Sequence, residues 1–115
     1  MKTTIEFLDA VKAKLGIESD YALAKRLGFP LSTVSNYRTG RRVLDDDAAL
    51  SVANVLDVHP FVVIASANAE RAKTPEQRER WSSVMEKFSA SFRNLLSGWT
   101  GEERRRVQRL QVSVH

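Results

Sequence analysis

Apolar residues along the chain recur mostly at steps of three and four, which is the period of an amphipathic α-helix, and no stretch alternates like a β-strand. The first helix is predicted between Thr3, which has capping-box spacing to Glu6, and a stop at Gly16. Four more helices are predicted, from Ser19 to Gly28, Pro30 to Thr39, the Asp45-Asp46-Asp47 run to about Leu56, and His59-Pro60 to about Ala72. Residues 1–73 are therefore predicted to form a five-helix domain.

A long helix is predicted after this domain. Thr74 is a strong N-cap, with Pro75 in the first turn and Gln77 three residues on. The apolar stripe that follows consists of Trp81, Val84, Met85, Phe88, Phe92, Leu95 and Leu96. It predicts about six helical turns up to Gly98, and a short helix is predicted from Arg104 to about Val112. The expected fold class is all-α, with a second segment, 74–115, that forms a C-terminal helical extension.

Composition argues against several kinds of active site. Cysteine is absent, which removes disulfides, thiolate metal sites and cysteine nucleophiles. The two histidines, His59 and His115, have no evident nucleophile to activate, and no glycine loop suited to phosphate occurs. The acidic run Asp45-Asp46-Asp47 fits the positive end of a helix dipole better than a metal site, since consecutive helical side chains diverge. We expect no enzyme activity, no cofactor, no metal ion and no small-molecule ligand.

The chain also lacks the signals of a membrane or secreted protein. No run approaches the roughly 18 uninterrupted apolar residues of a membrane span, and the segment Met1 to Glu6 has no signal-peptide core. We expect a cytoplasmic protein without a membrane partner.

Basic charge is concentrated in two segments. The 115 residues carry a formal charge of +4. Between Ser19 and Arg42 there are five basic residues against Asp20 alone, and a second basic run lies in the C-terminal tail at Arg104-Arg105-Arg106 and Arg109. A basic helical segment of the first kind is what a DNA-binding surface requires. For the tail, solubility is the default interpretation, and added nucleic-acid affinity is the alternative.

The segment from Asp20 to Thr39 has the pattern of a helix-turn-helix. Leu23, Ala24, Leu27, Val34 and Tyr37 occupy its inward positions, and Gly28 supplies the turn. This pattern, with the basic loop that follows it and the Leu56-to-Pro60 entry into a fifth helix, resembles the lambdoid phage repressor and Cro family over about residues 3–72. Two positions depart from the family pattern. Asp20 replaces a neutral phosphate-binding side chain, and Pro30 replaces a Ser/Thr cap.

The resemblance implies a sequence-specific transcriptional regulator of phage or prophage genes, more readily a repressor than an activator, with double-stranded DNA as its partner. Base-reading residues carried over from the family are Leu31, Ser32, Ser35 and Asn36. Phosphate-binding residues carried over from it are Ser19, Thr33, Arg38, Thr39, Arg41 and Arg42.

The long C-terminal helix has two interpretations that the sequence leaves open. Such regulators usually bind a two-fold operator as homodimers, and the helix then dimerises through Trp81, Val84, Phe88, Phe92 and Leu95. Alternatively, it packs on its own domain. A different function class also remains open, namely an antitoxin-like or adaptor protein that binds a partner protein through residues 75–97.

Overall fold

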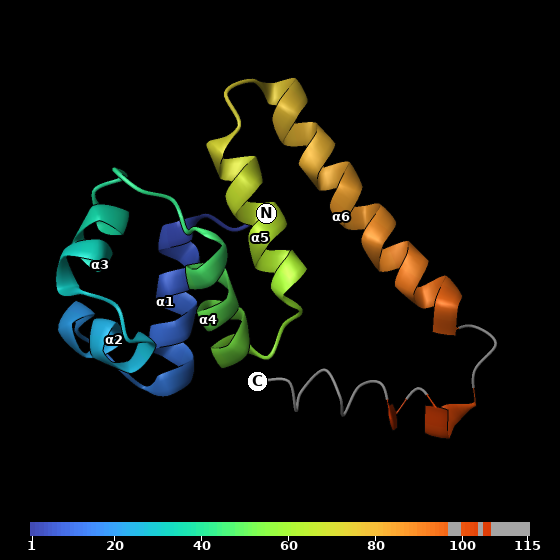
Figure 1. The fold of residues 1–115 in the computed structure, drawn as a ribbon, viewed down its shortest axis with the longest axis horizontal. Coiled ribbons are helices and arrows are strands. Elements are labelled where there is room, and N and C mark those ends of the chain that lie inside the picture. Colours follow the sequence, from blue (N-terminus) through green and yellow to red (C-terminus); the bar gives the residue numbers. More distant parts are fainter. Residues whose placement is uncertain (97–99, 104, 107–115) are drawn as a thin grey trace.

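The computed structural model describes residues 1–96, 100–103 and 105–106, without the side chains of Phe92 and Leu96. Helices account for all the regular structure in these residues (Figure 1). The main helices are α1 (Thr4–Leu15), α2 (Asp20–Leu27), α3 (Leu31–Arg38), α4 (Asp46–Leu56), α5 (Pro60–Arg71) and α6 (Pro75–Leu96). The predicted all-α class is confirmed. Residues 101–103 and 105–106 are also helical, after reciprocal hydrogen bonds between Thr100 and Glu103. The rest of the predicted helix 104–112 and of the basic tail lies outside the described residues.

Most helix ends are fixed by the side chains that the sequence indicates. Thr3 and Glu6 form a reciprocal capping box at the start of α1. The side chain of Ser19 accepts from the amide of Ala22, and that of Asp45 accepts from the amide of Ala48, at 2.8 Å. These caps satisfy amide groups that the first helical turn leaves without a partner.

Two helix ends lack the usual capping residue. Pro30 occupies the N-cap of α3, as the sequence indicates, and makes no side-chain capping bond. Asp57 ends α4 in the left-handed conformation, with φ of 56°, a role that usually falls to glycine. Aspartate tolerates this conformation better than most residues because its short polar side chain can bond locally.

One hydrophobic core joins the first five helices. In Figure 1, α1 lies between the α2–α3 pair on one side and α4 and α5 on the other. The largest fully buried aliphatic side chains of the core are Leu8, Val11, Leu23, Val34, Leu44, Val52 and Val63. Burial of each stabilises the fold by about 1.5–3 kcal/mol before conformational entropy is counted. This core holds α3 at the edge of the molecule with one side free.

The long helix α6 returns along α5. The ring of Phe88 lies 4.7 Å from the ring of Phe61 and 5.0 Å from that of His59, measured between centroids. These contacts join α6 to the start of α5, so the helix packs on its own domain, one of the two arrangements the sequence left open. Residues 89–96 of α6 continue beyond this contact (Figure 1). None of the described helices is long and apolar enough to span a membrane.

Candidate nucleic-acid interface

The α2–turn–α3 unit is held from its inner side. The turn depends on Gly28, whose φ of 73° is readily available to glycine, and the amide of Phe29 closes it by donating to the carbonyl of Ala24 at 2.9 Å. Val34 and Tyr37 are buried almost completely beneath α3. Burial raises the pKa of the Tyr37 phenol above its ordinary value. With these anchors inside, the opposite face of α3 contributes nothing to the core.

The predicted base-reading residues share that outer face. Leu31 is 50% exposed, Ser32 and Ser35 are exposed, and Asn36 is half-buried. In the described part of the chain, their side chains take part in no hydrogen bond or ion pair. The face is therefore polar, accessible and uncommitted, apart from the apolar Leu31.

Among the predicted phosphate-binding residues, Arg38 is the one held by the most extensive ion pairing within the described chain. Its Nη1 donates to the carboxylate of Asp9 at 2.7 Å, and its Nε and Nη2 donate to that of Asp20 at 3.1 and 2.9 Å. Lys12 adds an ion pair to Asp20 at 3.3 Å. The Arg38 hydrogen bonds hold the pKa of the Asp20 carboxyl below its ordinary value.

This cluster of Asp9, Lys12, Asp20 and Arg38 ties the end of α3 to α1 and to the start of α2. A phosphate would have to compete with two carboxylates for Arg38, so its role in DNA binding stays a prediction while its packing role is observed. Sequence reasoning missed the cluster. Its two acids and two bases are visible in the sequence, but they lie on three helices, and their pairing depends on how α1 crosses α2 and α3.

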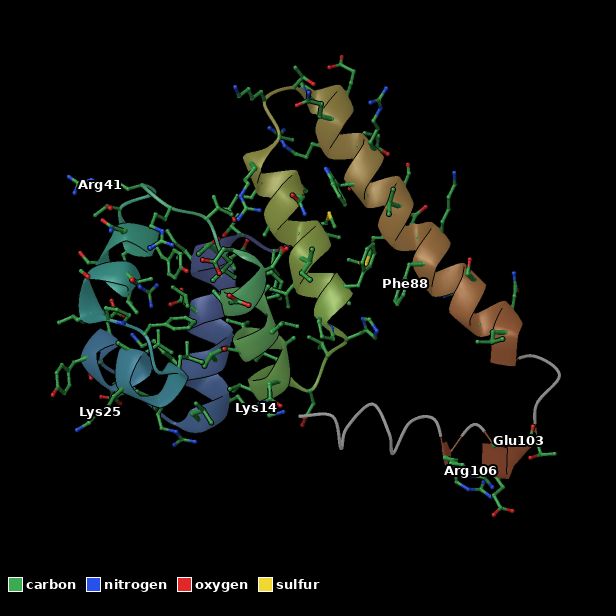
Figure 2. All side chains as sticks on the ribbon, in the orientation of Figure 1. Lys14, Lys25, Arg41, Phe88, Glu103 and Arg106 are labelled. Atoms are coloured by element: carbon green, nitrogen blue, oxygen red, sulfur yellow. The ribbon has the colours of Figure 1, made fainter. Side chains whose placement is uncertain are left out.

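The loop after α3 carries the other predicted arginines. Gly40 turns the chain with φ of 78°. Arg42 lies 3.4 Å from the carboxylate of Asp45 and above the ring of Tyr37. Arg41 extends away from the domain at the end of α3 (Figure 2), and its guanidinium meets no carboxylate among the residues described. Arg41 is thus free to meet an anion, and Arg42 is held only by exposed contacts.

The remaining predicted phosphate-binding residues, Ser19, Thr33 and Thr39, differ in exposure and in the hydrogen bonds they already make. Ser19 is exposed, but its hydroxyl oxygen already caps α2. Thr33 is half-buried, and the exposed Thr39 donates its hydroxyl to the carbonyl of Asn36 at 3.3 Å.

The far end of the same loop is anchored at Leu44, another contact that the sequence did not indicate. The Leu44 amide donates to the buried Thr4 hydroxyl at 3.2 Å, and its carbonyl accepts from the Arg71 guanidinium. The Thr4 hydroxyl in turn donates to the carboxylate of Glu70 at 2.8 Å. The basic loop is therefore fixed to the start of α1 and the end of α5.

The predicted dimerisation residues divide into two groups. Trp81 and Phe88 are half-buried, and Phe88 packs on the start of α5. Val84 and Leu95 are 41% and 58% exposed. The side chain of Phe92 lies outside the described residues. Of the four whose side chains are described, Val84 and Leu95 leave the most of their apolar surface open in the single chain.

The acidic run 45–47 behaves as a helix start. Asp45 caps α4, and no group of acids and histidines in the described residues is arranged to hold a metal ion.

Comparison with known proteins gives one informative relative. No family model matches the chain, and no solved structure matches it. The chain is 36% identical over 84 residues to the uncharacterized protein Gp-c of Pseudoalteromonas phage PM2, an alignment that covers 69% of this chain and 90% of Gp-c.

Proposed function

The chain belongs to the family of the phage protein Gp-c, and from this premise we propose that it is a sequence-specific DNA-binding regulator of phage or prophage genes. In this proposal, α1 to α5 form a repressor-like domain and α3 is the recognition helix. Repression is the simpler outcome, because a bound protein occludes polymerase without further machinery.

One observation carries the proposal. Val34 and Tyr37 anchor the inner side of α3 in the core. On the outer side, Leu31, Ser32 and Ser35 are exposed. Arg41, which has no carboxylate partner among the described residues, follows at the end of the helix. An anchored helix with an uncommitted polar face fits the major groove, where side chains meet base edges. Arginine beyond its end suits the phosphates that flank the groove.

The chemistry of each base-reading residue suggests its contact. The Asn36 amide can bond to adenine N6 and N7, Ser32 and Ser35 can bond to any base edge, and Leu31 can cover a thymine methyl. Arg41 and Arg42 supply the salt-dependent part of the affinity, with Ser19, Thr33 and Thr39 as secondary backbone contacts.

A two-fold operator requires two copies. In our proposal the copies associate through the open side of α6 at Val84 and Leu95, whereas Phe88 serves mainly to dock α6 on α5. The same exposed residues favour a second candidate function, in which α6 binds a partner protein and α3 plays no role.

A binding titration tests the proposal. The purified chain is titrated against the DNA upstream of its own gene and against a scrambled duplex, at two salt concentrations. The Asn36→Ala/Arg41→Ala double variant is expected to lose the preference for the native duplex. Lys14→Ala, which removes a positive charge at the far side of α1 (Figure 2), is expected to keep it. Equal weak binding of the wild type to both duplexes would instead favour the partner-protein function.

A further inference from the structure

Tyr21 and Lys25 form an exposed pair on α2 that the proposed function does not use. Tyr21 is 63% exposed, the largest exposure among the bulky apolar and aromatic side chains described. Lys25 follows one turn later, with its ammonium nitrogen 5.8 Å from the centre of the Tyr21 ring. The ring contributes little to the core, so it is accessible to a partner, together with the ammonium group beside it.

This pair lies on the edge of the molecule that carries the recognition helix. In Figure 2, Lys25 and Arg41 mark the two ends of one edge, with α3 between them. The exposed face of α3 is thus flanked by a cation on each side. If α3 lies in the major groove of a duplex, the two sugar-phosphate backbones that border the groove pass near Lys25 and Arg41.

The charges on this edge favour an anion. From Ser19 to Arg42 the one acid is Asp20, whose carboxylate is already bonded to Arg38 and Lys12. Glu18 precedes the helix, at the end opposite to Lys25. In the described part of the chain, Lys25 has no carboxylate partner, and so its charge is uncompensated.

We infer that Tyr21 and Lys25 bind the sugar-phosphate backbone of duplex DNA beside the half-site read by α3. The Lys25 ammonium pairs with a phosphate, and the Tyr21 hydroxyl donates to a phosphate oxygen, both being common partners of the DNA backbone. The inference rests on the proposed function and extends its footprint across α2. These contacts add affinity and fix the docking angle, and they select no base.

The test measures affinity for a mixed-sequence duplex over a salt series, since phosphate contacts act on any sequence. Lys25→Ala is expected to reduce the slope of log affinity against log salt by about 0.9, the loss for one phosphate contact. Tyr21→Ala and Tyr21→Phe are expected to weaken binding several-fold and equally. Lys14→Ala removes the same charge at the far side of α1 and serves as the matched control, and circular dichroism checks that each variant folds.

The outcomes separate the two proposals. If Arg41→Ala loses affinity while Lys25→Ala and Tyr21→Ala bind as the wild type does, the extended footprint is wrong and α3 binding stands. If Tyr21→Phe binds as tightly as the wild type, the proposed hydrogen bond from the Tyr21 hydroxyl to a phosphate is wrong. If Lys14→Ala lowers the slope as much as Lys25→Ala, the effect is general charge and the inference fails. If the wild type shows no retention at all, the DNA-binding function itself fails.

Discussion

Arg38 and Asp20 are joined side by side, with Nε and Nη2 of the guanidinium donating to the carboxylate at 3.1 and 2.9 Å. This bidentate pair links the last turn of α3 to the first turn of α2, the two ends of the helix-turn-helix. The orientation of α3 therefore depends on a charge pair as well as on the hydrophobic contacts beneath it.

Replacing Asp20 with asparagine should lower the free energy of unfolding by about 1 kcal/mol. Partly exposed pairs contribute less than buried ones, although bidentate geometry favours this pair. Urea denaturation measures the loss. Asp9→Asn is the matched control, because its more exposed carboxylate accepts a single bond from Arg38. A loss as large in Asp9→Asn would assign the stabilisation to charge in general.

The same pair predicts a pH dependence. Hydrogen bonds from Arg38 lower the pKa of Asp20 in the folded chain, so the contribution is complete above the unfolded value of about 4 and is lost as pH falls through the folded value. The difference in unfolding free energy between the wild type and Asp20→Asn should thus be full at pH 7 and shrink below about pH 4. A difference that stays constant to pH 2 would contradict this assignment.

Thr4→Val should destabilise the chain by about 1–3 kcal/mol despite its equal size, because the amide of Leu44 and the carboxylate of Glu70 both lose a buried partner. Hydrogen exchange at the Leu44 amide should accelerate more than the loss of global stability alone would cause, since the bond to Thr4 anchors the basic loop. Thr33→Val, on α3, is the control and should change stability little. Unchanged exchange at Leu44 in Thr4→Val would show that Arg71 alone holds the loop.

Gly28→Ala should cost about 1–2 kcal/mol through backbone strain. At φ of 73° an L-residue is unfavourable, whereas an added Cβ meets no atom within 4 Å. Gly28→Asn should cost less, because asparagine enters this conformation more easily. Thermal denaturation of both variants checks the order, and equal losses would mean that the strain is not conformational.

Phe88 and Leu95 should have different effects although both lie on the apolar stripe of α6. Phe88→Ala removes the ring contacts with His59 and Phe61 and should lower stability by about 1–2 kcal/mol, less than for a fully buried ring. Leu95→Ala should leave stability unchanged and weaken self-association. Sedimentation velocity over a concentration range measures the second effect. A wild-type mass that stays monomeric at every concentration would remove the dimer from the proposal.

Local signals in the sequence were sufficient for the helices. Capping residues such as Thr3, Ser19 and Asp45 act on amide groups within three positions, so their effect can be predicted from neighbours alone. The end of α4 at Leu56 was predicted, but the left-handed conformation of Asp57 was not, because no glycine marks it. The exposed face of α3 also follows from helical spacing, once Val34 and Tyr37 are assigned to the core.

Contacts between distant segments were not predictable in the same way. The cluster around Arg38 and the chain from Glu70 through Thr4 to Leu44 join residues that only the packing of α1 brings together. The apolar stripe of α6 predicted burial but not its partner, because a helix on its own domain and a helix on a second copy require the same pattern. Each of these depends on tertiary geometry that periodicity does not encode.

The outer side of α3 has one further consequence. Ser32 and Ser35 neither pack in the core nor bond to another side chain in the described structure, so replacing them should leave stability almost unchanged. Mutations there are free to accumulate without loss of the fold, whereas those at Val34 or Tyr37 are not. Under the proposed function, related chains would therefore differ in the DNA they recognise while the scaffold beneath α3 stays the same.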